Sequence, residues 1–203
     1  MDARPSTAPL PFTPRQRLRF YWLRDHGFLR AIWRNFYRLD DEVWRHNHPS
    51  PARLAKLKAM GAASVLSLRG EGAPVSVLEA GACHALNLPF RGIGLSALTL
   101  PEPQALLELL DALRTMPKPV VVHCKSGSDR TGLAATLYLH VIKGVPLDQA
   151  RRQLALRYIH NRWGGAGIVH ALLDAYAAAH ADTGIEFEDW VQTAYDPAAL
   201  SKK

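Results

Sequence analysis

The sequence HCKSGSDRTG, residues 123–132, lies between a strand-like run at 120–122 and a helix-like run at 133–142. A loop at such a junction directs successive backbone N–H groups inward, and the helix that follows adds about half a positive charge at its N-terminus, so the loop is suited to an anion. We expect Cys124 to lie in this field, where the thiolate is favoured over the thiol. Arg130 can reach back over the loop and bind two phosphate oxygens through its planar guanidinium. The stretch therefore predicts a phosphate-binding loop that carries its own nucleophile.

This stretch resembles the Cys-x5-Arg loop of the protein tyrosine phosphatase superfamily, whose pattern is His-Cys-x-x-Gly-x-x-Arg-Ser/Thr-Gly. Every fixed position of that pattern is filled here, and the strand before it and the helix after it agree with its structural context. Ahead of the loop, residues 49–51 (PSP), a helix-like run and residues 64–70 (SVLSLRG) are similar to the opening of compact bacterial tyrosine or dual-specificity phosphatase-like proteins. The resemblance covers about residues 36–180.

The resemblance implies a role for each residue of the loop. Cys124 attacks the phosphorus of a phosphate monoester and forms a phosphocysteine, which water then hydrolyses. Arg130 and the loop amides stabilise the equatorial oxygens in both steps. Thr131 donates a hydrogen bond to the sulfur, and His123 orients the loop through backbone groups. No metal or other cofactor is needed. The residues expected to contact the phosphate group are Lys125, Ser126, Gly127, Ser128, Asp129 and Arg130.

The general acid is the point at which the chain departs from the superfamily pattern. Most members carry an Asp roughly thirty residues before the cysteine, which protonates the leaving oxygen, but residues 89–98 (PFRGIGLSAL) hold no carboxylate. Asp129, inside the loop, resembles an Asp in the loops of myotubularins, Sac-type phosphatases and several phosphoinositide phosphatases. It is either the acid or a structural residue that pairs with a basic neighbour. Glu102 fits the start of a helix, and Asp111 fits a solvated position within one.

Two substrate classes stay open. A phosphorylated protein, phosphotyrosine above all, is the first expectation from the superfamily. A phospholipid, phosphoinositide or inositol phosphate is the alternative, favoured by Asp129, by the missing loop acid and by Lys125, which either adds a cation at the rim or is a solvated lysine. A non-catalytic phosphate-binding scaffold is the remoter alternative, and the presence of both Cys124 and Arg130 argues against it.

The order of the remaining elements predicts an α/β fold with a central, mainly parallel sheet of about four to five strands flanked by helices, similar to that of dual-specificity phosphatases. Strands are expected at residues 63–68, 83–88 and 120–123. Helices are expected at residues 52–60, 75–82, 103–116, 131–143, 146–158, 165–181 and 187–194. We divide the chain into a flexible leader (1–14), a basic aromatic helical extension (15–48) and a cysteine-dependent phosphatase domain (49–200).

The formal net charge is +7, and positive residues gather near the N-terminus. A basic helix with aromatic residues can lie at the surface of an anionic membrane. Residues 15–37 are therefore expected either to make peripheral membrane contact or to pack on the domain with their arginines in solvent. No nucleic-acid-binding motif accompanies the charge, and no nucleic acid partner is expected. The residues concerned are Arg15, Arg17, Arg19, Phe20, Tyr21, Trp22, Arg24, Phe28, Arg30, Trp33, Arg34, Phe36 and Tyr37.

The chain has two cysteines, Cys83 and Cys124, which give no disulfide framework. A thiolate nucleophile is better kept in a reducing compartment, and no apolar run reaches the length of a membrane span. A cytoplasmic location is therefore expected, with peripheral contact at the inner membrane face as a further expectation. Cys83 is expected in the core, in the strand at 83–88; within reach of Cys124 it would form a reversible disulfide.

The histidines do not show the spacing of a metal-ligand set, so no metal site is assigned. A polar, glycine-rich connection at residues 157–167 includes His160. It is expected to be either a plain helix-to-helix loop or a border of the active site.

Overall fold

The computed structural model describes residues 33–72, 74–161 and 167–201. All the elements below belong to one compact unit, Arg34–Lys203. The predicted leader at 1–14 and most of the basic stretch at 15–37 lie outside the described residues. Within the described part, no helix is both long enough and apolar enough to cross a membrane.

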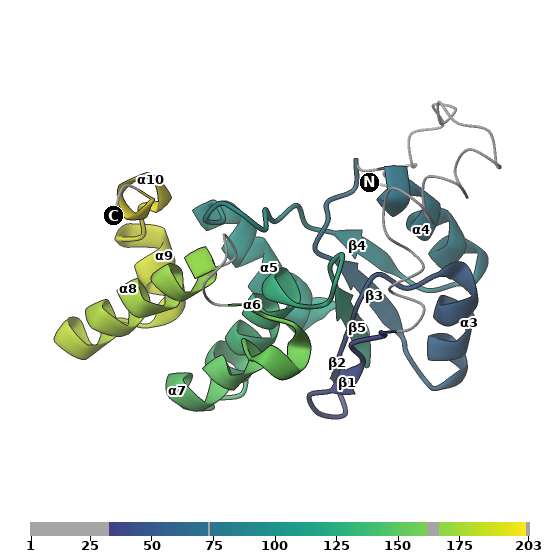
Figure 1. Cartoon of the computed structure of the whole chain (residues 1–203), viewed down its shortest axis with the longest axis horizontal. Helices are drawn as coiled ribbons and strands as arrows, with labels where there is room; N and C mark the ends of the chain where they lie inside the picture. The colour runs from purple at the N-terminus through teal and green to yellow at the C-terminus, as the bar shows by residue number, and fades with distance from the viewer. Residues whose placement is uncertain (1–32, 73, 162–166, 202–203) are drawn as a thin grey trace. The chain divides into compact units, whose positions relative to one another are not determined.

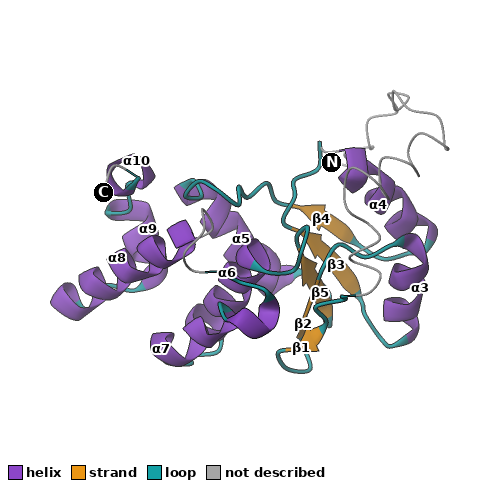
Figure 2. Cartoon of the chain, viewed as in Figure 1, coloured by secondary structure: helices purple, strands orange, loops and turns teal. Residues whose placement is uncertain are grey.

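A five-stranded sheet forms the centre of this unit (Figures 1 and 2). Its strands are β1 (Tyr37–Arg38), β2 (Val43–His46), β3 (Ser64–Ser67), β4 (Phe90–Gly92) and β5 (Val120–His123). The order is β1-β2-β5-β3-β4, and all neighbours are parallel except β1, which pairs with β2 in the antiparallel direction. The sheet confirms the predicted α/β fold with a mainly parallel sheet, and it places β5 at the centre.

Helices cover both faces of the sheet (Figure 2). On one face lie α3 (Pro51–Ala59) and α4 (Pro74–Ala85), and on the other lie α5 (Pro103–Thr115) and α6 (Asp129–Leu137). The other helical elements are the π-helical turn η2 (Tyr138–Ile142), α7 (Leu147–Ala150), the 3-10 turns η3 (Arg151–Gln153) and η4 (Leu156–Tyr158), α8 (Ile168–Thr183), α9 (Phe187–Thr193) and α10 (Pro197–Leu200). Buried residues of α8 and α9 join the same core as α5 and α6.

Side chains alternate along the strands and so divide the core into two layers. Val120 and Val122 belong to the large layer that includes α5 and α6, together with Leu66 of β3. Val121 and Val65 belong to the smaller clusters that include α3 and α4. All five are at most 2% exposed. A strand buried on both faces has to be apolar throughout, which explains why the Val-Val-Val run becomes the central strand.

Residues 83–88 do not form a strand, and this prediction is wrong. Val75, Glu79 and Cys83 are buried at a spacing of four residues, so they line one face of α4, and the next strand is the three-residue β4 at the sheet edge. Cys83 lies in the layer of α3 and α4, whereas Cys124 lies in the layer on the opposite face, and both are free thiols. The sheet separates them, which excludes a disulfide between them in this fold.

Three other segments differ in extent from the prediction. β1 and β2 lie within residues 15–48, the stretch assigned to an extension, so the sheet begins there and not at residue 49. The helix expected at 146–158 is broken into α7, η3 and η4, because Leu154 leaves the helical conformation with φ −104° and ψ 70°. The helix expected at 131–143 consists of α6 continued by η2.

Candidate active site

Residues 124–130, called the Cys-x5-Arg loop below, join the carboxyl end of β5 to the first turn of α6. In open parallel sheets, ligands bind at this end of the strands. Gly127 has a φ of +72°, and a Cβ atom there would lie 2.6 Å from the carbonyl oxygen of His46. Glycine is therefore required for the loop to pass the end of β2.

Cys124 lies at the start of this loop and is 1% exposed. Burial by itself would raise the pKa of the thiol. The charge of Arg130 and hydrogen bonds from Thr131 and from the Gly127 amide outweigh burial, so the pKa lies below its ordinary value. The Thr131 hydroxyl is buried and makes no other hydrogen bond within the part of the chain described. The fold thus brings these residues together and favours the thiolate.

Arg130 lies against the ends of two neighbouring strands. Its Nη1 donates to the carbonyl oxygens of Leu95, at 3.2 Å, and Leu68, at 3.4 Å. Leu95 belongs to the stretch 89–98, so this stretch lies beside the guanidinium although it holds no carboxylate. The buried Nε of Arg130 makes no hydrogen bond to any of the described residues. A buried donor without a partner is costly, and an anion held in the loop would provide the partner.

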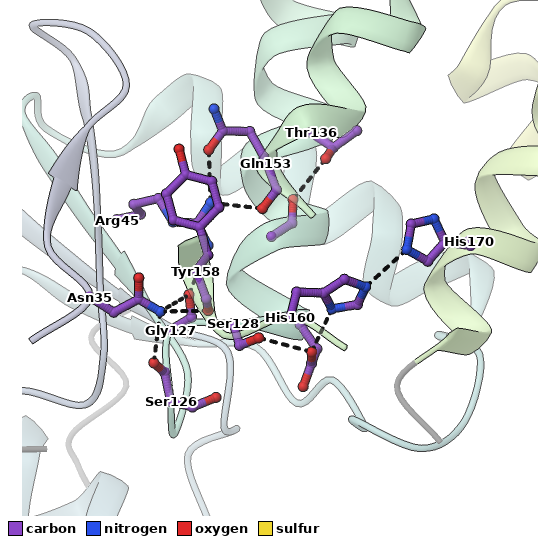
Figure 3. Close-up of polar contacts among 12 residues, drawn as sticks. Asn35, Arg45, Ser126, Gly127, Ser128, Thr136, Gln153, Tyr158, His160 and His170 are labelled. Carbon is purple, nitrogen blue, oxygen red and sulfur yellow. Dashed lines mark hydrogen bonds and ion pairs between the residues drawn. The ribbon is translucent and has the colours of Figure 1, made fainter. Parts of the chain in front are cut away.

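Asn35 holds the backbone of the loop from outside (Figure 3). Its Nδ2 donates to the carbonyl oxygens of Ser126 at 3.1 Å, Gly127 at 2.9 Å and Tyr158 at 3.0 Å. Asn35 is 4% exposed. Because one amide group contacts both the loop and the end of η4, it fixes their relative position.

Arg45 makes a second link of the same kind (Figure 3). It is fully buried on β2. Its Nη2 donates to the Gly127 carbonyl at 2.8 Å, and its Nη1 donates to the backbone and side-chain oxygens of Gln153 at 2.9 and 2.7 Å. The guanidinium lies 3.6 Å from the centre of the Tyr158 ring. Residues 151–158 are therefore part of the support of the loop.

A buried trio of His123, Glu79 and His48 lies beside the first residues of the loop. His123 Nε2 is 2.7 Å from Glu79 Oε1, and His48 Nδ1 is 3.5 Å from Glu79 Oε2. His123 Nδ1 lies 3.2 Å from the Cys124 carbonyl oxygen, and the His48 amide donates to the Lys125 carbonyl at 3.2 Å. The trio therefore supports the loop through its backbone, and Glu79 of α4 connects the two imidazoles.

The same trio has ligand atoms within 4.8 Å of one another, close enough to hold a metal ion. Two imidazoles and a carboxylate would suit zinc. His123 Nε2 and Glu79 Oε1 are, however, already in direct contact at 2.7 Å. Three ligands also leave a structural zinc site incomplete. The trio therefore fits a structural support of the loop better than a metal centre.

Asp129 is bound by two side chains. Its Oδ1 lies 2.7 Å from His160 Nδ1 and accepts a hydrogen bond from the Ser128 hydroxyl at 3.0 Å. Burial would raise the pKa of Asp129, but the hydrogen bonds from His160 and Ser128 and the charges of His160 and Arg130 hold it below its ordinary value. Of the two roles predicted for Asp129, the structural one requires a basic partner, and His160 provides it.

The other carboxylates considered for the acid lie elsewhere. Asp111 forms an ion pair with Arg91 at 2.7 Å on the surface. Glu102 is exposed and immediately precedes α5 as its N-cap residue. Both have the structural positions that the sequence predicts.

Several residues of the site are absent from the sequence-based candidates, among them Asn35, Arg45, Glu79 and His160. Only His160 carried a signal, because residues 157–167 were considered as a border of the site. The other three lie in other elements or in segments far from the loop in sequence, and no motif marks them.

Comparison with known proteins agrees with this geometry. The model of a family described as "Tyrosine phosphatase family" matches residues 33–153. A curated relative, the inositol diphosphatase DSP3 of Arabidopsis thaliana, is 30% identical over 103 residues, which are 48% of this chain and 50% of that protein. The chain thus spans about half the length of the curated relative that it matches.

Two solved structures show the same fold. TpbA of P. aeruginosa is 22% identical, with a TM-score of 0.55, and the match covers 73% of this chain and 91% of that chain. The core catalytic domain of the PP-IP phosphatase SIW14 of S. cerevisiae is 19% identical, with a TM-score of 0.53, and the match covers 68% of this chain and 84% of that chain. Since the family match includes more than half of the chain and the whole Cys-x5-Arg loop, this chain belongs to the tyrosine phosphatase family.

Proposed function

We propose that this chain is a cysteine-dependent phosphatase that hydrolyses phosphate monoesters through a phosphocysteine intermediate and is of the tyrosine or dual-specificity type. The observation that carries the proposal is the buried Cys124 thiol, whose pKa is lowered by Arg130 and Thr131 at the N-terminus of α6. Membership of the tyrosine phosphatase family supports it. A scaffold that only binds phosphate would have no need of an activated thiolate.

In the first step, the Cys124 thiolate attacks phosphorus, the S–P bond forms and the P–O bond to the leaving group breaks. Arg130, including its free Nε donor, binds the equatorial oxygens together with the loop amides. These contacts stabilise the charge of the transition state and so lower the barrier to phosphoryl transfer. In the second step, water attacks phosphorus and the sulfur leaves as thiolate, helped by the Thr131 hydroxyl. Asp129 gives the proton to the leaving oxygen and later takes one from the attacking water.

A phosphorylated protein is the first substrate we propose. The structure of TpbA in complex with phosphotyrosine, 21% identical to this chain with a TM-score of 0.54, shows that a protein of this fold accepts that group. An inositol phosphate or phosphoinositide is the second candidate, supported by the curated relative, an inositol diphosphatase, and by the placement of Asp129 and Lys125 in the loop.

Two finer proposals concern location. The free thiols Cys83 and Cys124 suit a reducing, cytoplasmic compartment. Peripheral contact with an anionic membrane through residues 15–37 is supported by their arginines and aromatic rings.

The test is phosphate release by the purified chain, without added metal, from a phosphotyrosine peptide, a soluble inositol diphosphate and anionic vesicles carrying a phosphoinositide. Cys124→Ser should abolish release from whichever substrate is used and should retain that substrate in pull-downs. Cys83→Ala, which removes the thiol on the opposite face of the sheet, is the matched control and should stay active. Near-normal turnover by Cys124→Ser would overturn the mechanism, and the preferred substrate decides between the two classes.

A further inference from the structure

Three side chains form a hydrogen-bonded chain that leads from the Cys-x5-Arg loop to α8. Asp129 Oδ1 lies 2.7 Å from His160 Nδ1, and His160 Nε2 lies 2.9 Å from His170 Nε2 (Figure 3). The two imidazole rings are 5.1 Å apart. His160 is 2% exposed, whereas His170, in the first turn of α8, is partly exposed. The chain therefore runs from the site through a buried imidazole to one with access to solvent.

The hydrogen-bonding partners limit where the protons of this chain can lie. The Asp129 carboxylate can only accept, so His160 Nδ1 carries a hydrogen and donates it. At the 2.9 Å contact between His160 Nε2 and His170 Nε2, one ring nitrogen carries the hydrogen and the other accepts it. Every contact in the chain is thus one donor facing one acceptor, in an order that allows each proton to move one place toward Asp129.

The backbone is built to hold His160 in this position. Ile159, which precedes it, has a φ of +62°, a left-handed conformation that is unfavourable for a β-branched residue. Such strain persists only where the surroundings impose it and is concentrated at functional sites. Here the surroundings are Asn35 and Arg45, which hold Tyr158 next to the loop.

The chemistry of the site needs such a chain. Residues 89–98 lie beside Arg130 but contain no carboxylate. Asp129 is the carboxylate inside the loop, yet its contacts with His160 and Ser128 stabilise its ionised form, which has no proton to give. An acid at this position requires a proton supply.

We propose that His160 and His170 form a proton relay that protonates Asp129 as the leaving group departs. This inference rests on the proposed phosphatase function. A proton moves from the His170 imidazolium to His160 Nε2, the proton on His160 Nδ1 moves to Asp129, and the Asp129 proton moves to the leaving oxygen. In the second step, Asp129 accepts the proton of the attacking water, the two shifts run in reverse, and His170 becomes an imidazolium again. No proton is gained or lost by the relay over one turnover.

The relay can be separated from a purely structural role by conservative variants. In His160→Asn, the amide nitrogen takes the place of Nδ1 and can still donate to Asp129, but it cannot pass on a proton. His170→Gln likewise keeps a donor at the position of Nε2. His140→Asn is the matched control, because His140 Nδ1 and Nε2 also contact a carbonyl and a buried hydroxyl, those of Val145 and Tyr176, away from the loop.

Each variant is assayed with an alkyl phosphate, whose leaving group needs a proton, and with p-nitrophenyl phosphate, whose leaving group does not. Because general acids contribute about 10²–10⁴-fold, we expect His160→Asn to lower kcat/KM about 100-fold for the alkyl ester and less than about tenfold for the aryl ester. His170→Gln should show the same selectivity, and Asp129→Asn combined with His160→Asn should be no slower than Asp129→Asn alone.

The outcomes are distinct. Equal losses on both esters, or no loss on either, would overturn the relay while leaving the phosphatase proposal intact. If the wild-type chain hydrolyses neither ester and none of the substrates named above, the phosphatase proposal fails and the relay with it. Any loss of both activities in the His140→Asn control would show that the assay reports fold stability, and thermal unfolding of each variant would then decide.

Discussion

Arg45→Met is expected to lower both the stability of the fold and the activity per folded molecule. The change leaves the backbone and side-chain oxygens of Gln153 without donors, at about 1–3 kcal/mol each, and removes the contact with the Tyr158 ring, about 2 kcal/mol. The Gly127 carbonyl keeps its bond from Asn35. One effect offsets part of this loss of stability. Burial lowers the pKa of Arg45 to about 10, so keeping the guanidinium charged in the core costs about 3 kcal/mol, and an uncharged methionine does not have this cost. The net destabilisation is about 1–5 kcal/mol.

The expected loss of activity follows from the contact between Arg45 and the Cys-x5-Arg loop. Arg45 holds the Gly127 carbonyl, and its charge also acts on Cys124. Because a loop displaced by about 1 Å can cost 10²-fold in rate, we expect kcat/KM on p-nitrophenyl phosphate to fall about 100-fold per folded molecule. Urea unfolding gives the folded fraction, and Arg38→Met is the control, since Arg38 also lies over an aromatic ring but is exposed. Unchanged activity per folded molecule, with a stability loss above about 5 kcal/mol, would refute this reasoning and make Arg45 a purely structural residue.

Three further predictions concern the loop and the two core layers. Gly127→Ala should abolish activity and lower the melting temperature, because its Cβ would lie 2.6 Å from the His46 carbonyl oxygen; a fully active variant would contradict the loop geometry. Iodoacetamide should modify Cys124, whose pKa is lowered, at neutral pH and below, whereas Cys83, whose pKa burial raises to about 12, should react only after unfolding; mass spectrometry of the two peptides against pH tests this. Glu79→Gln should destabilise the fold by about 1–3 kcal/mol, because the buried His48 and His123 side chains lose their carboxylate partner, and a chelator should leave wild-type stability unchanged; a melting temperature that falls with chelator would show that the trio binds a metal.

The interactions of Cys124 with Arg130 and Thr131 could be predicted from the sequence because all three residues lie in one short stretch. One loop holds Cys124, the nucleophile that we propose, together with Arg130 and the glycines that shape the backbone, so ten consecutive residues specify most of the proposed anion site. The strand β5 was equally predictable, since a run of three valines buried on both faces suits only a central strand. The resemblance to the superfamily then supplied the order of the remaining elements.

Local patterns failed where burial depends on a distant partner. The alternation that would mark β2 as a strand is hidden by Arg45 and His46, which are buried although polar. At Cys83, the short apolar run suits a strand or a helix equally. The buried face of α4 includes Glu79, and a carboxylate is not predicted to be buried when its partners, His48 and His123, lie in other segments. A charged residue is expected on the surface unless its partner is known.

These failures share one cause that also explains how the site works. Arg45, Glu79 and His160 are almost completely buried polar residues, and each would be destabilising if its partners lay elsewhere. Each finds those partners at the Cys-x5-Arg loop: a carbonyl of Gly127, the histidine before Cys124, and the carboxylate of Asp129. A loop held by its own residues alone would relax when the anion leaves. Since these three contacts reach the loop from β2, from α4 and from the segment before α8, we expect the fold to hold the loop in one shape throughout a catalytic cycle, so that the proposed reaction needs little reorganisation of the loop.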